Sequence, residues 1–496
     1  MQDSRLVRTL SSAVARWTEA QQTPTYRTVG VLLGLAICAA VVASPPPEGL
    51  SVAGWRTLGV TCLMGLWWLG GVLPLTVTAL VPIVAFPLLG VSGIKEAAAP
   101  YAHPLLFLML GGFILGRAME VVGLHERLVA VLLRPAALRS TPRRAMLGLM
   151  IAAAVLSGLV SNTATAVMML PLALLMADQA GTGPRARSAF ALGLAYAASI
   201  GGVSTLIGTF PNAVFAQNAA GVGREVSFAS WMVVGVPFVL VAIPVAWWIV
   251  SRMLVPAEGK RVPAPPIPQW RPGEQQVLGV VGGAMLLWLT RRPVDLGVLV
   301  LPGWGELVGL TSSSDDAWVA IGASMVLFVL RSGGRFVIDF RDVEKNIPWS
   351  VMFLLGGGFS LAVAIKSTQL TEWLAGATQL LGALPPGVDI LVICLSVTFL
   401  TELTSNTATT QILLPLLAAG AVQAGVDPVV WMVPATISAS CAFMMPVATP
   451  PNAIAAQGAD VAPSDMVTAG FFLNLALAIL ASLIAGTLAP LAFPTL

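Results

Sequence analysis

The stretch LVSNTATAVMMLP, at residues 159–171, has a near copy, LTSNTATTQILLP, at residues 403–415. In each copy a Ser-Asn-Thr cluster separates two apolar arms that are short for a bilayer span. Such a turn is tolerated at membrane depth only inside protein or beside water. The two stretches therefore predict a pair of re-entrant helical hairpins, over 144–180 and 389–424.

The composition of the whole chain places these hairpins in a membrane. Of 496 residues, 57% are hydrophobic and 10% are charged, whereas about a quarter of the residues in a soluble domain are charged. The formal net charge of +3 is too small to indicate nucleic acid as a partner. We expect an all-α, polytopic membrane protein surrounded by lipid.

Eleven further apolar runs approach the length of a membrane span, with boundaries uncertain by several residues. They lie at 28–44, 53–70, 73–91, 104–123, 187–207, 229–250, 276–290, 316–330, 349–365, 428–446 and 466–492. A proline-rich segment at 262–274 reads as a linker between two halves of the chain.

Basic residues set the expected orientation of these spans. The loops richest in Arg and Lys are the N-terminal arm, 125–144, 252–271 and 331–345. Because basic loops are retained in the cytoplasm, eleven spans and two hairpins put the N-terminus inside and the C-terminus outside. Arg291 and Arg292 fit this layout poorly, since they fall at an outer end.

The two halves of the chain read as repeats. FLMLGGF at 107–113 matches FLLGGGF at 353–359, and GTFPNA at 208–213 matches ATPPNA at 448–453. These motifs and the Ser-Asn-Thr clusters recur in the same order at nearly constant spacing. The first hairpin should open toward the cytoplasm and the second outward. This predicts inverted repeats, the architecture of a transporter with its binding site near the membrane midplane.

Prolines interrupt two otherwise spanning helices, at 204–217 and at 445–457. Proline lacks an N–H and breaks the helical ladder, so a break in lipid leaves carbonyls that need partners. A simple proline kink is the alternative. The PNA that follows each break favours a true interruption, in which Asn212 and Asn452 cap the second half-helix. Capping of a turn is likewise the alternative explanation for Ser161-Asn162-Thr163 and Ser405-Asn406-Thr407.

Together, the hairpin tips and the breaks offer a particular set of ligands. Carbonyl, hydroxyl and amide oxygens are hard, neutral ligands that suit Na⁺ better than soft metals. Free N–H groups at half-helix N-termini suit an anion. Neither a tip nor a break contains Lys or Arg. A neutral cradle that binds an anion well only when Na⁺ is present would couple the two gradients.

Three ionisable residues within apolar stretches are also candidates for function. Arg117 and Glu120 are spaced to pair on one helix face, although they could equally reach the cytoplasmic interface. Glu402, beside the second tip, could tune a cation site or anchor the hairpin, and the sequence supports the two roles evenly.

The signatures FLTELTSNTATTQILLPLLA, ASCAFMMPVATPPNAIA and SGLVSNTATAVMMLP resemble those of the divalent-anion:sodium symporter family of di- and tricarboxylate transporters. The resemblance covers nearly the whole chain. It implies Na⁺ as coupling ion, a C4-dicarboxylate as the expected substrate, and no organic cofactor. It also implies a homodimer in a bacterial plasma membrane that works by an elevator mechanism, in which a transport domain slides against a scaffold.

The resemblance also implies the site residues. One Na⁺ would bind Ser157, Ser161, Asn162 and the carbonyl of Gly208. A second Na⁺ would bind Thr401, Ser405, Asn406 and the carbonyl of Ala448. The substrate carboxylates would meet Asn162, Thr163, Thr209, Asn406, Thr407, Thr449 and Pro450. The chain departs from the family at Phe210, where the family often has a small residue or proline, and this bulky ring could narrow the substrate pocket.

The same resemblance divides the chain into domains. The expected parts are a cytoplasmic arm at 1–27, scaffold helices at 28–143 and 275–388, a linker at 255–274, and transport-domain parts at 144–254 and 389–496.

Three other functions are alternatives to Na⁺-coupled symport. A Na⁺-independent dicarboxylate exchanger of the same fold is the main alternative. An intramembrane hydrolase that uses Ser161 or Ser405 lacks a nearby His or Lys as base, so we do not expect an enzyme. A channel fits broken helices with paired caps less well than alternating access does.

Overall fold

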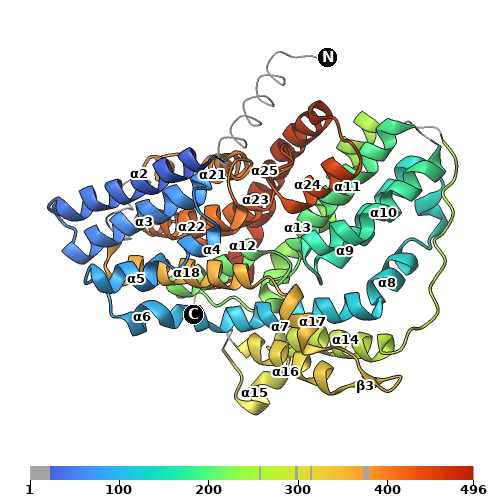
Figure 1. Ribbon diagram of the computed structural model, residues 1–496, viewed down its shortest axis with the longest axis horizontal. Helices are drawn as coiled ribbons and strands as arrows, with labels where there is room; N and C mark the ends of the chain where they lie inside the picture. The colour runs from blue at the N-terminus through green and yellow to red at the C-terminus, as the bar shows by residue number, and fades with distance from the viewer. Residues whose placement is uncertain are drawn as a thin grey trace. The chain divides into compact units, whose positions relative to one another are not determined.

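The computed structural model describes residues 23–181, 183–255, 259–295, 300–312, 315–370, 373 and 379–494. Over these residues the chain is mostly helical (Figure 1), which confirms the predicted all-α class. Most of the predicted N-terminal arm, residues 1–22, lies outside the described residues.

Both predicted helical hairpins are present. The first consists of α9 (Pro142–Ser157) and α10 (Asn162–Ala180), and the second of α21 (Val388–Thr401) and α22 (Asn406–Gln423). In each, the Ser-Asn-Thr cluster lies at the turn. Gly181 ends α10 in the left-handed conformation, with φ of 66°, which glycine adopts at little cost. That the hairpins re-enter a bilayer from one side stays a prediction.

Both predicted breaks are also present. In the first, α11 (Pro184–Gly202) ends before α12 (Phe210–Gly221) begins. In the second, α23 (Pro428–Ala439) ends before α24 (Pro450–Gly458) begins. Prolines stand in the first turn of α24, where the missing N–H would have no helical partner in any case.

The remaining long helices coincide with predicted spans. They are α2 (Pro24–Ala43), α3 (Val52–Gly70), α7 (Pro104–Val122), α13 (Phe228–Leu254), α14 (Glu274–Thr290), α16 (Asp316–Val329), α18 (Trp349–Ser367) and α25 (Pro463–Ala492). Among the described residues, six helices are long and apolar enough to cross a membrane by length and composition. The chain from 259 to 273 has no helix or strand, as expected of a linker.

One predicted span is not a continuous helix. The run at 73–91 forms α4 (Leu75–Thr78) and α5 (Val81–Leu88). Pro82 lies in the first turn of α5, and proline has no N–H to donate to the carbonyl of Thr78, four residues back at the end of α4. The chain therefore begins a new helix there.

Several short elements connect the long helices. The helical ones are α6 (Ile94–Ala98), η1 (Ala99–Ala102), α8 (Leu124–Leu132), η2 (Ala136–Arg139), α15 (Trp304–Val308), α17 (Phe340–Asn346) and α20 (Gln379–Gly382). Two antiparallel ladders, β1 (Val294–Asp295) with β2 (Val300–Leu301) and β3 (Arg331–Ser332) with β4 (Arg335–Phe336), were not predicted.

The chain divides into two compact units. Unit 1 combines Met1–His103, Phe210–Arg224 and Trp349–Thr495, and most of unit 2 is Pro104–Thr209 and Glu225–Pro348. The boundary passes through the first break, between Thr209 and Phe210. The predicted assignment of helices to a scaffold and a transport domain stays a prediction.

Each unit contains one hairpin, packed in the same pattern. In unit 2, α11 lies against both arms of the first hairpin, and α13 packs on α9 and α11. In unit 1, α23 lies against both arms of the second hairpin, and α25 packs on α21 and α23. The helix that leads into each break is therefore held between a hairpin and a long helix (Figure 1).

Candidate functional site

The first hairpin tip brings several oxygens together. Ser157, the last residue of α9, has its Oγ 2.6 Å from Asn162 Oδ1 and 2.7 Å from the Ala198 carbonyl oxygen. A single hydroxyl proton cannot serve both acceptors. Ser161 caps α10 instead, since its Oγ accepts the Ala164 N–H at 3.2 Å. The capping role weighed for Ser161 is thus confirmed.

The Asn162 amide oxygen faces only acceptors and its nitrogen faces only donors, and turning the amide satisfies both. The nitrogen then donates to Ser157 Oγ at 2.6 Å and to the carbonyl oxygens of Ala198 and Gly208 at 3.2 Å. These oxygens repel one another unless the amide turns to donate its nitrogen or a cation lies among them. The same set of uncharged oxygens is what Na⁺ prefers. The residues present therefore fit the predicted cation.

Two glycines permit this close approach. A Cβ added to Gly202 would collide with the Asn162 amide, and one added to Gly208 would collide with the Gly202 carbonyl. Gly202 was not predicted as a site residue. In the sequence, Gly202 is only a glycine near the end of an apolar run. Such glycines are common, so this one could not be recognised as part of a site.

The second tip repeats the arrangement with different residues. Thr401, the last residue of α21, has its Oγ1 2.7 Å from Asn406 Oδ1 and 3.1 Å from the Ala439 carbonyl oxygen. Ser405 lies at the N-cap position of α22 without a side-chain capping bond. Among the described residues, no hydrogen bond joins Ser405 or the Ala448 carbonyl to the Thr401–Asn406 pair.

Glu402 anchors the second break. The carboxylate is 3% exposed, and its Oε1 accepts the N–H groups of Phe443 at 2.6 Å and Met444 at 2.8 Å. Oε2 accepts the Met445 N–H at 3.0 Å, and Asn474 of α25 donates its amide to Oε1 at 2.6 Å. Of the two roles weighed for Glu402, this geometry favours anchoring.

The prediction that Asn212 and Asn452 cap the second half-helices was wrong. Asn212 lies inside α12. Thr449 caps α24, and its Oγ1 accepts the Asn452 N–H at 3.3 Å. The Asn452 side chain instead donates to the carbonyls of Ala442 at 2.9 Å and Met445 at 3.1 Å. It thus satisfies carbonyls that the break leaves open.

The first break is held by hydroxyl and indole donors. Thr205 Oγ1 donates to the Gly158 carbonyl at 2.6 Å, which ties the break to the hairpin tip. Trp231 of α13 donates its Nε1–H to the Val203 carbonyl at 2.8 Å. The backbone around Gly208 is therefore fixed by side chains that were not predicted as site residues.

The predicted ligands differ in exposure. The buried ones are Ser157, Thr209, Gly208, Thr401, Thr407 and Thr449. The partly exposed ones are Ser161, Asn162, Ser405, Asn406 and Ala448, and the exposed ones are Thr163 and Pro450. A substrate that binds Thr163 or Pro450 therefore meets groups already open to its approach.

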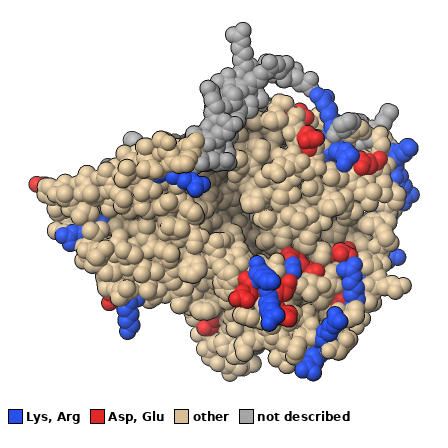
Figure 2. All heavy atoms as spheres, viewed as in Figure 1, with Lys and Arg blue, Asp and Glu red and all other residues tan. Residues whose placement is uncertain are grey.

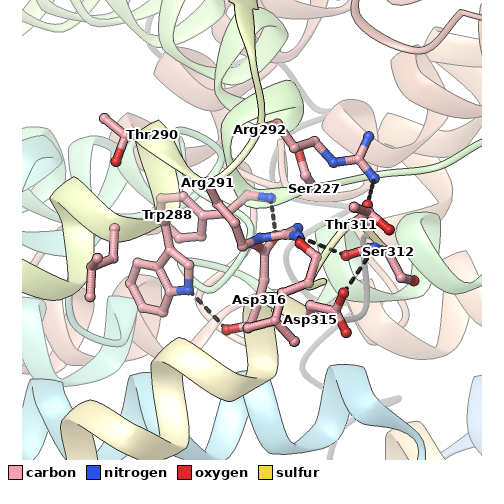
Figure 3. Close-up of polar contacts among 12 residues, drawn as sticks. Ser227, Trp288, Thr290, Arg291, Arg292, Thr311, Ser312, Asp315 and Asp316 are labelled. Carbon is pink, nitrogen blue, oxygen red and sulfur yellow. Dashed lines mark hydrogen bonds and ion pairs between the residues drawn. The ribbon is translucent and has the colours of Figure 1, made fainter. Parts of the chain in front are cut away.

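A buried ion pair fixes the start of α13, the helix that carries Trp231. Figure 3 shows Arg291 and Asp316 side by side, each 1% exposed in its side chain, with Nε 2.7 Å from Oδ1. The other carboxylate oxygen of Asp316 accepts the Phe228 N–H at 2.6 Å. Arg292 pairs with Glu225. These partners account for two arginines that fitted the predicted orientation poorly.

The pairing expected of Arg117 and Glu120 is confirmed, at 2.8 Å. Arg117 also makes two bonds of 2.7 Å to the carboxylate of Asp342 in α17. This contact holds the pKa of Asp342 below its usual range. The triad joins α7 to α17 and makes no contact described here with the hairpin tip.

Comparison with known proteins gives consistent matches over most of the chain. A family model described as "Citrate transporter" matches residues 64–435. The sodium-dependent dicarboxylate transporter SdcS of Staphylococcus saprophyticus is 35% identical over 471 residues, which is 90% of this chain and 88% of that protein. The protein of the same name from Staphylococcus aureus strain RF122 is 33% identical over 480 residues, with 92% and 90% covered.

Among solved structures, the crystal structure of the Alcanivorax borkumensis YdaH transporter is similar, with a TM-score of 0.54 at 16% sequence identity. The match covers 93% of this chain and 96% of that one. At this identity the likeness concerns the fold alone.

Proposed function

Because the chain belongs to the divalent-anion:sodium symporter family, we propose that it carries a C4-dicarboxylate across the membrane together with Na⁺. The chain is a multi-pass membrane transporter and not an enzyme. The similar proteins are named as sodium-dependent dicarboxylate transporters, and Na⁺-coupled dicarboxylate transport is the function that we assign to the chain.

The oxygen cluster around Asn162 is the observation that carries this proposal. The Ser157 hydroxyl and the Ala198 and Gly208 carbonyls converge on one end of the Asn162 amide, at 2.6 Å for Ser157 and 3.2 Å for the two carbonyls, and in the absence of a cation the amide nitrogen donates to them. A cation of single charge balances such oxygens without requiring a carboxylate ligand. The matched Thr401–Asn406 contact of 2.7 Å supports a second site of the same kind. Ser161, Ser405 and Ala448 complete the proposed ligand sets.

The proposed substrate ligands are uncharged. A dicarboxylate would be bound by Asn162, Thr163 and Thr209 from one repeat and by Asn406, Thr407, Thr449 and Pro450 from the other. The N-termini of α10, α22 and α24 offer partial positive charge to the carboxylates. Bound Na⁺ would supply further positive charge beside the carboxylates. Na⁺ and the dicarboxylate would then each raise the affinity of the other by the same factor.

We further propose that transport follows an elevator mechanism in a homodimer built from inverted repeats, with the N-terminus in the cytoplasm and the C-terminus outside. The similar packing of α9–α11 with α13 and of α21–α23 with α25 supports a repeat. A rigid element that carries its own cation ligands can move as a body without losing its site.

An uptake assay tests the function. Purified protein in liposomes should take up labelled succinate when Na⁺ is higher outside, and uptake should fall to background when choline replaces Na⁺. Uptake that ignores Na⁺ and requires unlabelled dicarboxylate inside would overturn symport in favour of exchange. Single-channel currents would contradict alternating access.

Two substitutions test the site within this assay. Asn162→Ala and Thr407→Ala should reduce uptake to the level of empty liposomes, because each removes a ligand without filling the space. Asn346→Ala in α17, at an exposed position, and Thr468→Ala in α25, at a partly exposed one, are matched controls and should keep wild-type uptake. If either site variant transports as well as its control, the tips do not form the site.

A further inference from the structure

Asn162, at the first tip, has a side-chain amide whose two ends have opposite surroundings. When the amide oxygen points toward Ser157, it faces only hydrogen-bond acceptors, and the nitrogen at the other end faces only donors. A carboxamide oxygen accepts hydrogen bonds and its nitrogen donates them. In this oxygen-in orientation both ends of the amide are therefore unfavourable when no ligand is bound.

The reverse, nitrogen-in orientation satisfies both ends of the amide. Nδ2 then donates to Ser157 Oγ at 2.6 Å, and it lies 3.2 Å from the carbonyl oxygens of Ala198 and Gly208. Ser157 Oγ donates its own hydrogen to the Ala198 carbonyl at 2.7 Å. The amide nitrogen thus occupies the place among these oxygens where Na⁺ is proposed to bind, so Na⁺ has to displace it.

Two ligands of opposite charge would together make the oxygen-in orientation favourable. At one end, a cation would attract Asn162 Oδ1 and the oxygens of Ser157 and Gly208. At the other end, Nδ2 would join the donors that it faces, and a group of donors binds a carboxylate. Either ligand alone leaves one end of the amide unfavourable. The Asn162 amide therefore favours binding of both ligands or of neither.

The surroundings of Asn162 give its amide room to turn. A Cβ on Gly202 would collide with Oδ1 and crowd Nδ2, so glycine at this position leaves the space that a turn requires. Among the described hydrogen bonds and ion pairs, no Lys, Arg, Asp or Glu side chain contacts Asn162. Figure 2 likewise shows few charged side chains over much of the face that it draws. The charges that decide the orientation of the amide therefore have to come from the ligands.

We propose that Asn162 is a two-position switch that couples Na⁺ to the substrate. The empty tip holds the amide nitrogen-in, and Na⁺ and a substrate carboxylate together hold it oxygen-in. Each ligand then raises the affinity of the other because each removes part of the cost of the turn. This inference rests on the proposed function, and it names the residue through which the two ligands act on each other.

The second tip is already in the orientation that a cation requires. Asn406 Oδ1 accepts the Thr401 hydroxyl at 2.7 Å, so its oxygen already lies toward a residue that is proposed to bind the second Na⁺. The two asparagines are proposed ligands of the same type in matching positions, but only Asn162 has to turn. The same substitution at both tips therefore separates a switch from a plain ligand.

Na⁺ titrations of the purified full-length protein test the switch. The unfolding temperature is followed at constant ionic strength, with choline in place of Na⁺, in the presence and absence of succinate. The two titrations give the factor by which succinate raises Na⁺ affinity, which should be about ten or more for the wild type. A serine has one hydroxyl and cannot meet a cation at one end and an anion at the other. In Asn162→Ser this factor should therefore fall at least about fivefold.

Asn406→Ser is the matched variant. It removes a proposed ligand, so it should weaken Na⁺ binding, but it leaves the switch intact and should keep the wild-type factor. Equal factors in the two variants would overturn the switch. A wild type whose Na⁺ affinity does not change with succinate would instead contradict the proposed symport, so the two failures are distinguishable.

Solid-state NMR of the reconstituted wild type tests the orientation of the amide directly. Asparagine side chains carry ¹⁵N, and succinate carries ¹³C in its carboxyl groups. The ¹⁵N signal of Asn162 is assigned by its loss in Asn162→Ser or Asn162→Asp. With Na⁺ and succinate bound, this signal should show a dipolar coupling to the succinate carboxyl carbons. Bound succinate that couples to Asn406 but not to Asn162 would overturn the proposal, and weak binding by a variant does not affect this result.

Discussion

The two hairpin tips solve the same backbone problem in partly different ways. At the first, donors satisfy carbonyls: Thr205 binds the Gly158 carbonyl and Trp231 binds the Val203 carbonyl. At the second, the Asn452 amide also donates to carbonyls, but a buried acceptor is added, since Glu402 binds three consecutive backbone N–H groups of the break. A helix break inside a membrane protein needs its backbone polar groups paired. Side chains that donate hydrogen bonds and side chains that accept them can both do this.

The two tips also differ in how tightly the backbone is packed. The first relies on Gly202 and Gly208, where a Cβ would collide with groups of the site, whereas the second has Ala448 at the position matching Gly208. Both breaks share one feature, a glycine of the neighbouring long helix pressed against the carbonyl of Val203 or Phe443. These are Gly235 in α13 and Gly470 in α25.

Removing the acid at the second tip should have the largest effect. Glu402→Ala leaves three N–H groups and the Asn474 amide unpaired in a buried place, which should cost about 3 kcal/mol or more of stability. Thr205→Val at the first tip loses one hydrogen bond and should cost about 1 kcal/mol. Thermal unfolding in detergent measures both. Equal shifts in Tm would mean that the two breaks depend similarly on their side chains.

Adding a methyl group at the first tip should have the next largest effect. Gly208→Ala forces the Gly202 carbonyl away and should cost about 1–3 kcal/mol through overpacking, with loss of Na⁺-dependent uptake. The reverse change at the second tip, Ala448→Gly, should cost less than about 1 kcal/mol and keep uptake. Gly221→Ala, where a Cβ meets nothing within 4 Å, is the control. Wild-type uptake by Gly208→Ala would show that transport does not need the close approach of Gly208 to the Gly202 carbonyl.

The smallest difference concerns the caps. Ser161→Ala removes the bond to the Ala164 N–H and should lower stability by about 1 kcal/mol, whereas Ser405→Ala has no capping bond to lose. Unfolding should be compared in Na⁺-free buffer, so that proposed cation binding does not contribute. A larger loss for Ser405→Ala would show that the capping contrast between the tips is not as described.

The hairpins and breaks were predictable because their causes are local. The Ser-Asn-Thr clusters and prolines act on residues beside them, and they recur. The residues that hold the breaks were not predictable in the same way. Glu402 meets Phe443 across 41 positions, and the Asn452 amide reaches back 10 positions to Ala442. Such contacts depend on the path of the chain through each break, which periodicity does not reveal.

Backbone contacts at the tips and short ladders could not be predicted for related reasons. The Ala198 and Ala439 carbonyls lie at the two tips, but an alanine in an apolar helix gives no sign of a carbonyl with a special role. The β3–β4 ladder lies within a loop identified only by its basic residues. Likewise Arg291 looked misplaced until its partner, 25 positions along, was seen beside it.

The clamp at the start of α13 has a consequence for how the protein is made. Asp316 follows Phe228 by 88 positions, so the ribosome must complete α14 and reach α16 before the first turn of α13 obtains its carboxylate. Arg291 is also synthesised before Asp316, so its guanidinium gains this partner late. The start of α13 can therefore complete its hydrogen bonds only after the first residue of α16 has been made.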